Sequence, residues 1–132
     1  MGHLPHGQTA RRLFLGERDM DQYMTRSMEL EWVQLVETGI KTDGISVKAL
    51  RIDKEAGRPL TFLIKFEAGA SYPKHSHPAG EEVFVLEGDV HFSSRKLNTG
   101  DYLYTPPGGV HEVYSEKGCV LLFIVPEEVV IL

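Results

Sequence analysis

The sequence predicts an all-β domain, either a sandwich or a barrel, and three observations lead to that class. From Glu29 onward, short segments rich in Val, Ile, Leu, Phe and Tyr alternate with turns rich in Gly, Pro and Asp. These segments recur at even spacing, and no helical pattern separates them. The 132 residues suffice for one domain with a single core. We therefore expect one barrel domain over residues 29–132, preceded by an N-terminal arm over residues 1–28.

Each apolar segment is expected to form one strand, with turn residues on either side. Glu87-Gly88-Asp89, for example, is expected to separate two strands. The expected strands are 32–37, 45–52, 60–66, 82–87, 90–93, 102–105, 111–115, 120–125 and 129–132.

The arm has a different pattern. Between Glu17 and Met28 the chain is polar, with Met20, Met24 and Met28 spaced four apart. This spacing predicts a short amphipathic helix. The alternative is an arm that packs these methionines onto the barrel or onto a partner subunit.

Composition excludes several classes of function. The net charge is −5, and the Lys and Arg residues are scattered, so no nucleic-acid surface is expected. No segment approaches the roughly 20 apolar residues of a membrane span. The N-terminus lacks the apolar region of a secretory signal. Cys119 is the single cysteine, which precludes an internal disulfide and predicts a small buried hydrophobe in a cytoplasmic protein.

A cluster of polar residues begins at Gly69. His75 and His77 are two residues apart, so on an extended chain they face the same side, as two ligands of one metal would. Two carboxylates follow, at Glu81 and Glu82. Because Pro78-Ala79-Gly80 is expected to turn, alternation along the strand does not decide between them.

A second segment brings one more histidine. Pro106-Pro107 and Gly108-Gly109 predict a tight turn, and His111 begins the next strand. A rigid turn that delivers one histidine at a strand start suits a ligand from a distant part of the sheet. The distance along the chain from His75 means that only the tertiary fold could bring the two together.

These two segments resemble the two motifs of the cupin family. The first family motif, G-x5-H-x-H-x3,4-E-x6-G, is matched by Gly69, His75, His77, Glu81 and Gly88. The second, G-x5-P-x-G-x2-H-x3-N, is matched by Gly100, Pro106, Gly108 and His111, with Ser115 in place of Asn. The resemblance implies a double-stranded β-helix, or jelly-roll barrel. It also selects Glu81 over Glu82, and it implies a metal held by His75, His77, Glu81 and His111.

Within that family the chain is most similar to ChrR-type cupins, on the segments HSHPAGEEVFVLEG, GDYLYTPPGGVH and SEKGCVLLFIV. The group is named for the cupin half of an anti-sigma factor. We expect no preceding domain and no cysteine-rich zinc site here, so control of a sigma factor is not expected. Close stand-alone relatives resemble dioxygenases that cleave small diketones or hydroxyacetophenones. The resemblance also implies a homodimer, with the arm and residues 129–132 as interface material.

Three imidazoles and one carboxylate suit Fe²⁺ or Zn²⁺ first, and also Mn²⁺, Ni²⁺ or Cu²⁺. In a six-coordinate metal they leave two positions, enough for a substrate oxygen and dioxygen, which favours a dioxygenase of a small carbonyl or phenolic compound. The alternatives are a non-catalytic sensor of a ligand or oxidant, with zinc, and a metal-dependent isomerase. The isomerase would need a base and a polar pocket that no sequence feature indicates.

The remaining candidates have simpler interpretations. Glu82 is expected at the surface or behind the ligands, and His91 as an ordinary strand residue. Tyr102 and Tyr104 share one face and either line the cavity or pack. Trp32 and Phe123 are expected in the core or at an interface. A dry pocket is expected between strands 60–66, 82–86 and 120–125, with Arg51, Arg58 and Lys65 near it. The expected role of His3 and His6 is adventitious metal binding.

Overall fold

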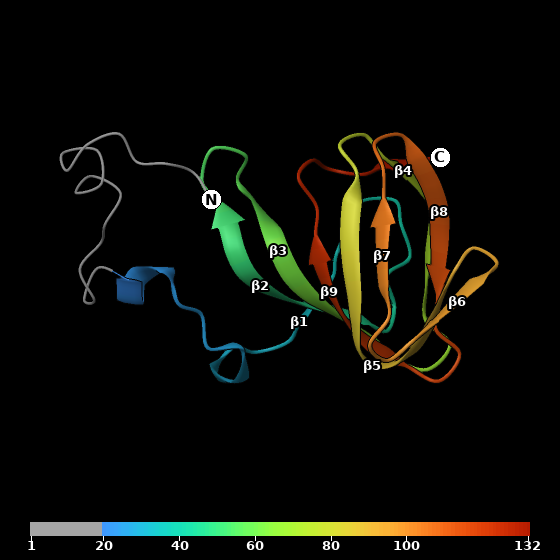
Figure 1. Ribbon diagram of the computed structural model, residues 1–132, viewed down its shortest axis with the longest axis horizontal. Helices are drawn as coiled ribbons and strands as arrows, with labels where there is room; N and C mark the ends of the chain where they lie inside the picture. Colours follow the sequence, from blue (N-terminus) through green and yellow to red (C-terminus); the bar gives the residue numbers. More distant parts are fainter. Residues whose placement is uncertain (1–19) are drawn as a thin grey trace, which may run out of the picture.

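The computed structural model describes residues 20–132, and it is all-β, as predicted. Antiparallel strands curl into an open barrel (Figure 1). Ten strands lie in the described part of the chain: β1 Val33–Gln34, β2 Ile45–Asp53, β3 Arg58–Phe66, β4 Ser71–His77, β5 Glu81–Phe92, β6 Arg95–Asn98, β7 Tyr102–Thr105, β8 Gly109–Tyr114, β9 Cys119–Ile124 and β10 Val130–Ile131.

The strand order is β1-β2-β3-β9-β5-β8-β4-β10, and β6 and β7 also pair with β5. The long strand β5 joins the two halves of the barrel, because its first part pairs with β9 and its last residues pair with β8. Within the part that pairs with β9, the register shifts between Val85 and Glu87. The prediction of two strands separated by a turn at Glu87-Gly88-Asp89 was wrong. The strand continues through these residues, and a bulge at Leu86, just before them, interrupts the regular pairing without ending the strand.

The core lies on the inner faces of the strands. In β5, Glu81, Val83 and Val85 are buried, while Phe84 and Leu86 point outward. Phe123 is buried too, and its ring stacks on Phe62 with ring centroids 5.6 Å apart. Alternation of buried and exposed residues is typical of a sheet with one face on a core.

Two strands were missed, β4 and β6. Strand β4 contains Pro73, Lys74, two histidines and two serines, which are not strong strand formers. It is held by its neighbours, since β8 pairs along one side and β10 along the other. The short strand β6 is also held by pairing, in its case with β5 on one side.

The predicted helix over Glu17–Met28 was wrong within the described residues, which begin at Met20. Two 3₁₀ turns occur there, η1 Asp21–Tyr23 and η2 Ser27–Glu29. The backbone between them is extended, with ψ 140° at Met24, so no continuous helical face forms. Met20, Met24 and Met28 are 45%, 54% and 90% exposed, so they do not pack onto the barrel either.

After these turns, Trp32 lies on the outer surface of the sheet. Its ring has the ammonium groups of Lys48 and Lys65 at 4.8 and 4.9 Å from the centroid. Lys65 thus faces away from the barrel interior, and the expectation that it lies near the pocket was wrong. The division of the chain at residue 28 stays a prediction. Among residues 20–132, no helix has the length and apolar character needed to span a membrane.

Candidate metal centre

Three strands bring the predicted ligands together. His75 and His77 lie on the inner face of β4, and His111 lies on the inner face of β8. His75 and His111 are directly opposite each other in the β4–β8 pairing. Glu81 is the first residue of β5 and its side chain is 4% exposed. All four residues are buried, and their ligand atoms lie within 4.8 Å of one another.

Two turns hold these strand ends in place. The backbone carbonyl of His77 accepts hydrogen bonds from the amides of Gly80 and Gly108, at 3.1 and 2.8 Å. Gly80 has φ +84°, and a Cβ there would lie 2.8 Å from the carbonyl oxygen of Thr105, so the turn into Glu81 requires glycine. The predicted turn before His111 is confirmed by the hydrogen bond from the Gly109 amide to the Pro106 carbonyl, at 2.9 Å.

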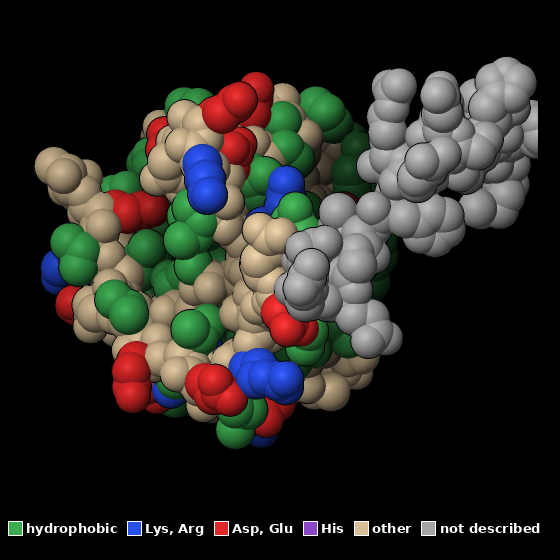
Figure 2. Space-filling model, turned by 90° about the vertical axis from the view of Figure 1, so that its left-hand side faces the viewer, with side chains coloured by type: hydrophobic (Ala, Val, Ile, Leu, Met, Phe, Trp, Pro, Cys, Tyr) green, Lys and Arg blue, Asp and Glu red, His purple; other side chains and the backbone are tan. Residues whose placement is uncertain are grey.

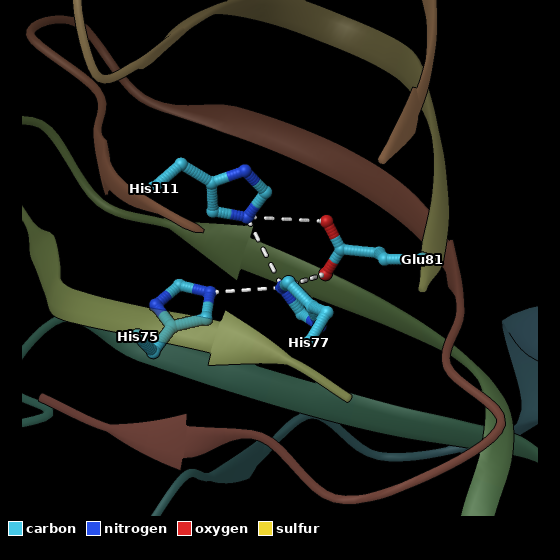
Figure 3. Close-up of side chains that lie close together, drawn as sticks. All are labelled: His75, His77, Glu81 and His111. Atoms are coloured by element: carbon cyan, nitrogen blue, oxygen red, sulfur yellow. Dashed lines mark hydrogen bonds and ion pairs between the residues drawn. The ribbon is translucent and has the colours of Figure 1, made fainter. Parts of the chain in front are cut away.

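The four side chains point toward one common position (Figure 3). The Nε2 atom of His77 lies 3.0 Å from that of His75 and 3.1 Å from that of His111. The Glu81 carboxylate lies 3.0 Å from His77 Nε2 and 3.3 Å from His111 Nε2. Nitrogen ligands about 2.1 Å from one ion, at right angles to each other, are separated by about 3 Å. The arrangement therefore fits a single divalent cation.

The hydrogen bonding of His75 leaves its inner nitrogen free for a metal. Its Nδ1–H donates to the carbonyl of Pro73 at 2.7 Å, so Nε2 carries the lone pair. Burial lowers the pKa of His75 to about 4, which keeps the imidazole neutral at physiological pH. A neutral imidazole is the form that binds metals.

Glu81 is the charged member of the cluster. Burial by itself would raise the pKa of Glu81, but hydrogen bonds from His111 and His77 outweigh it and lower that pKa. One carboxylate oxygen, Oε1, is buried and has only the imidazole Nε2 of His111 beside it, at 3.3 Å and without good hydrogen-bond geometry, and Nδ1 of His77 is buried without a hydrogen-bond partner. A buried anion whose neighbours are neutral imidazoles is costly unless a cation lies beside it. A metal ion would meet that need.

The cluster opens into a cavity of about 650 Å³, the size of a small-molecule site. His75, His77 and Glu81 form part of its wall, and most of the rest is hydrophobic. On the face shown in Figure 2, hydrophobic side chains gather around a hollow, with both acidic and basic side chains around it. The predicted apolar lining is confirmed for Phe62, Ile64, Phe66, Phe123 and Val125, but it was wrong for residues 82–86, none of which lines the cavity.

Glu37 and Tyr72 are two of the polar residues in the cavity wall that the sequence did not indicate. The hydroxyl of Tyr72 donates a hydrogen bond to Glu37 Oε1 at 2.5 Å, and the Tyr72 ring packs edge-on against His75 with centroids 5.0 Å apart. Burial, and then Glu37, raises the pKa of Tyr72, so the phenol keeps its proton. Regular alternation would put Tyr72 and His75 on opposite faces. A register shift between them brings both inside, and only the sheet pairing reveals it.

The other candidate residues lie apart from the cluster. Tyr102 and Tyr104 are each 55% exposed and are absent from the cavity wall, so, of the two alternatives, lining the cavity was wrong. Tyr102 donates a hydrogen bond to Glu82 at 2.6 Å, on the outer side of the sheet. Arg58 does line the cavity, whereas Arg51 is exposed. His3 and His6 lie outside the described residues.

The chain matches the ChrR Cupin-like domain over residues 20–128. It belongs to the ChrR Cupin-like family. The predicted cupin fold is confirmed by solved structures as well. A putative acetylacetone dioxygenase from Methylibium petroleiphilum aligns with a TM-score of 0.73 and 17% identity, covering 82% of this chain and 78% of that one. The polyketide cyclase RemF from Streptomyces resistomycificus aligns with a TM-score of 0.65 and 19% identity, covering 82% and 83%.

Each of the curated proteins named here matches less than half of this chain. The dimethylsulfoniopropionate lyase DddQ from Ruegeria pomeroyi is 36% identical over 55 residues, which are 38% of this chain and 27% of that protein. The chain spans only 20–27% of the length of the curated relatives it matches. The cupins similar to this chain thus include a lyase, a cyclase and a putative dioxygenase, and the fold by itself does not decide among these reactions.

Proposed function

We propose that this cupin binds one divalent metal ion through His75, His77, Glu81 and His111 and acts as a dioxygenase on a small carbonyl or phenolic compound. The observation that carries the proposal is the convergence of three imidazole nitrogens and one carboxylate within 4.8 Å. This donor set opens onto a mostly hydrophobic cavity of about 650 Å³. Neutral nitrogen and carboxylate ligands suit Fe²⁺, and they suit Zn²⁺ equally well.

The residues of the chain would perform three tasks. The Pro73 carbonyl orients His75 through Nδ1, and the β4–β8 pairing sets His111 opposite it. Glu81 supplies the negative charge. The hydrophobic wall keeps water from the reacting groups. When bound, a redox-active metal such as Fe²⁺ would supply Lewis-acid and oxygen chemistry for an enol or phenol substrate.

The choice of reaction rests on the similarity in fold to the putative acetylacetone dioxygenase, whose name indicates a small diketone. A diketone has two oxygens for a metal and an otherwise apolar body. Both features match this cavity. We therefore propose β-diketones and hydroxyaryl ketones as the first compounds to test.

Metal content is the first measurement. We expect near-stoichiometric metal in untagged wild-type protein and its loss in His111→Ala. His91→Ala is the matched control, because His91 lies on the other face of β5 from the buried residues Val90 and Phe92 and should leave the metal in place. Absence of metal from the wild type, even after reconstitution, would refute the proposal.

Oxygen uptake by the iron-loaded protein is the second measurement. We expect consumption of dioxygen with at least one β-diketone or hydroxyaryl ketone. It should be absent in Glu81→Gln and retained in Glu82→Gln, whose side chain faces Tyr102 on the outer surface. Tight zinc, no uptake across the panel and a ligand-dependent thermal shift would instead assign the chain to the sensor class.

The second candidate is a metal-dependent isomerase or another enzyme that moves a proton. No sequence feature indicates a base or a polar pocket, but Glu37 and Tyr72, which are joined by a hydrogen bond, both line the cavity. This observation favours an enzyme that moves a proton on its substrate. Exchange of substrate hydrogen with deuterium from the solvent, without oxygen uptake, would distinguish it from the dioxygenase.

We also propose a homodimer. Large apolar side chains are exposed on both segments predicted to form the interface, with Met28 90% and Leu132 64% exposed. Light scattering should give twice the mass of one chain, and Met28→Glu with Leu132→Glu should lower it. A mass of one chain for the wild type at micromolar concentration would contradict the dimer. The cytoplasmic location stays a prediction.

A further inference from the structure

Glu37 and Tyr72 form a polar site within the hydrophobic cavity. Tyr72 lies on β4, where its ring separates the Glu37 carboxylate from the imidazole of His75. Glu37 belongs to a different part of the chain, a short hairpin in which it forms an antiparallel β-bridge with Ile40. Both side chains line the cavity that contains the cluster. A ligand bound at the cluster could therefore reach this pair with its other end.

The hydrogen bond between the two residues determines what the pair can bind. Tyr72 has one hydroxyl proton, and Glu37 Oε1 accepts it at 2.5 Å. The phenol oxygen retains lone pairs, and an ionised carboxylate only accepts. The pair therefore presents acceptors to the cavity, and a ligand group that contacts it must donate.

The charge of Glu37 has no cationic partner in the described part of the chain. Among residues 20–132, the ion pairs within 4 Å involve Glu81 and Asp89, and none involves Glu37. Arg58, the cationic residue of the wall, donates to the carbonyl of Val125 at 2.9 Å. Glu128 also lines the cavity, so its wall has three carboxylates, of which Glu81 belongs to the metal cluster. A half-buried carboxylate without a cation is best satisfied by a positively charged donor from the ligand.

We propose that Glu37 and Tyr72 recognise a protonated amine on the ligand of this cavity. The ligand class is a small, mostly hydrophobic molecule with metal-binding oxygens at one end and an ammonium group at the other. This inference rests on the metal site of the proposed function, and it narrows the substrate class. A simple diketone has no such donor and would leave the pair unused.

The test uses zinc-loaded protein, so that no turnover occurs, and three probes of similar shape. Dopamine has a catechol and an ammonium group, 4-ethylcatechol lacks the nitrogen, and 3-(3,4-dihydroxyphenyl)propionate has the opposite charge. We expect calorimetry to show dopamine binding at least about tenfold more tightly than 4-ethylcatechol, the size of effect usual for a charge-assisted hydrogen bond. The anionic probe should bind most weakly.

Substitutions test whether Glu37 and Tyr72 cause the preference for dopamine over 4-ethylcatechol. Glu37→Gln keeps the shape and an acceptor for Tyr72 but removes the charge, so the preference for dopamine should fall to about threefold or less, with 4-ethylcatechol affinity unchanged. Tyr72→Phe, which releases Glu37, should reduce the preference as well. Glu112→Gln is the control, because Glu112 is exposed on β8 and is absent from the cavity wall. It should behave as the wild type.

A second arm separates this inference from the metal site. Phenethylamine has the ammonium group and the hydrophobic body but no metal-binding oxygens. Saturable shifts of the methyl resonances of Val113 and Val125, seen in metal-free wild type and lost in Glu37→Gln, would support the pair as the amine site. Failure to load zinc would refute the proposed function alone. Equal affinity for dopamine and 4-ethylcatechol, tighter binding of the anion, or no saturable shift with phenethylamine would overturn the inference.

Discussion

At the scale of single residues, the burial of His75 links stability to pH in the metal-free protein. The pKa of His75 is about 4 in the fold, below its ordinary value of 6.5, and the pKa of Glu81 is lowered too. The unfolded chain therefore binds more protons, and the free energy of unfolding falls as pH falls from about 6.5 towards 4. Thermal unfolding in chelator across that range should show the decrease. His75→Gln should show a smaller one, and an identical slope would contradict the assignment.

Cys119 illustrates the opposite case, a side chain without a role at the site. It is 4% exposed, and burial raises the pKa of its thiol. We expect negligible reaction with a thiol reagent at pH 8 in the native protein and full reaction in denaturant. Rapid labelling of the folded protein would show that this strand opens.

The same scale shows why one pair of residues was missed. His75, His77, Glu81 and His111 were found because short spacings and two family motifs carry them. Tyr72 was not, because the register shift before His75 reverses the side on which regular alternation would place it. Glu37 was not found either, because no motif or turn signal near it in the sequence predicts a position in the cavity.

At the scale of elements, the bend of β5 depends on Gly88. Gly88 has φ +75°, and a Cβ there would lie 2.3 Å from the carbonyl oxygen of Gly118 in the strand connection beside it. We expect Gly88→Ala to lower the free energy of unfolding by about 3 kcal/mol or more, because strain and a backbone clash add. Urea unfolding measures the change.

Gly57→Ala is the matched control for that substitution. Gly57 also has a positive φ, +67°, but nothing lies within 4 Å of the added Cβ. Only the left-handed conformation then costs energy, about 1 kcal/mol. Equal losses for the two variants would show that the contact with Gly118 contributes nothing.

Elements also differ in how well their sequences specify them. Strands β2, β3, β7 and β9 have apolar, β-branched or aromatic residues and were predicted within two residues of their observed ends. Strand β4 has a polar sequence and is a strand because β8 and β10 supply its hydrogen bonds. The methionine spacing predicted a helix in the arm, yet extended backbone at Met24 interrupts it.

At the scale of the whole molecule, metal binding should stabilise the fold. A ligand that binds only the native state stabilises it by about 2.7 kcal/mol at one hundred times its dissociation constant. For a domain of this size, that corresponds to a rise in melting temperature of roughly 10 °C. Zinc added to metal-free protein should produce this shift in the wild type and in Glu82→Gln. It should not do so in Glu81→Gln, and an unchanged shift there would remove Glu81 from the ligand set.

The sequence by itself determined the all-β class, the turns before Glu81 and His111, and the four members of the candidate metal cluster. Each of these features depends on local spacing, turn residues or a short motif, and the order of residues along the chain contains that information. The tertiary structure alone decided that β5 is one bent strand, that Tyr102 and Tyr104 face outward, and that Glu37 meets Tyr72 beside the metal ligands. These depend on strand register and on contacts between distant segments, because a shift of one residue in a strand moves a side chain to the opposite face.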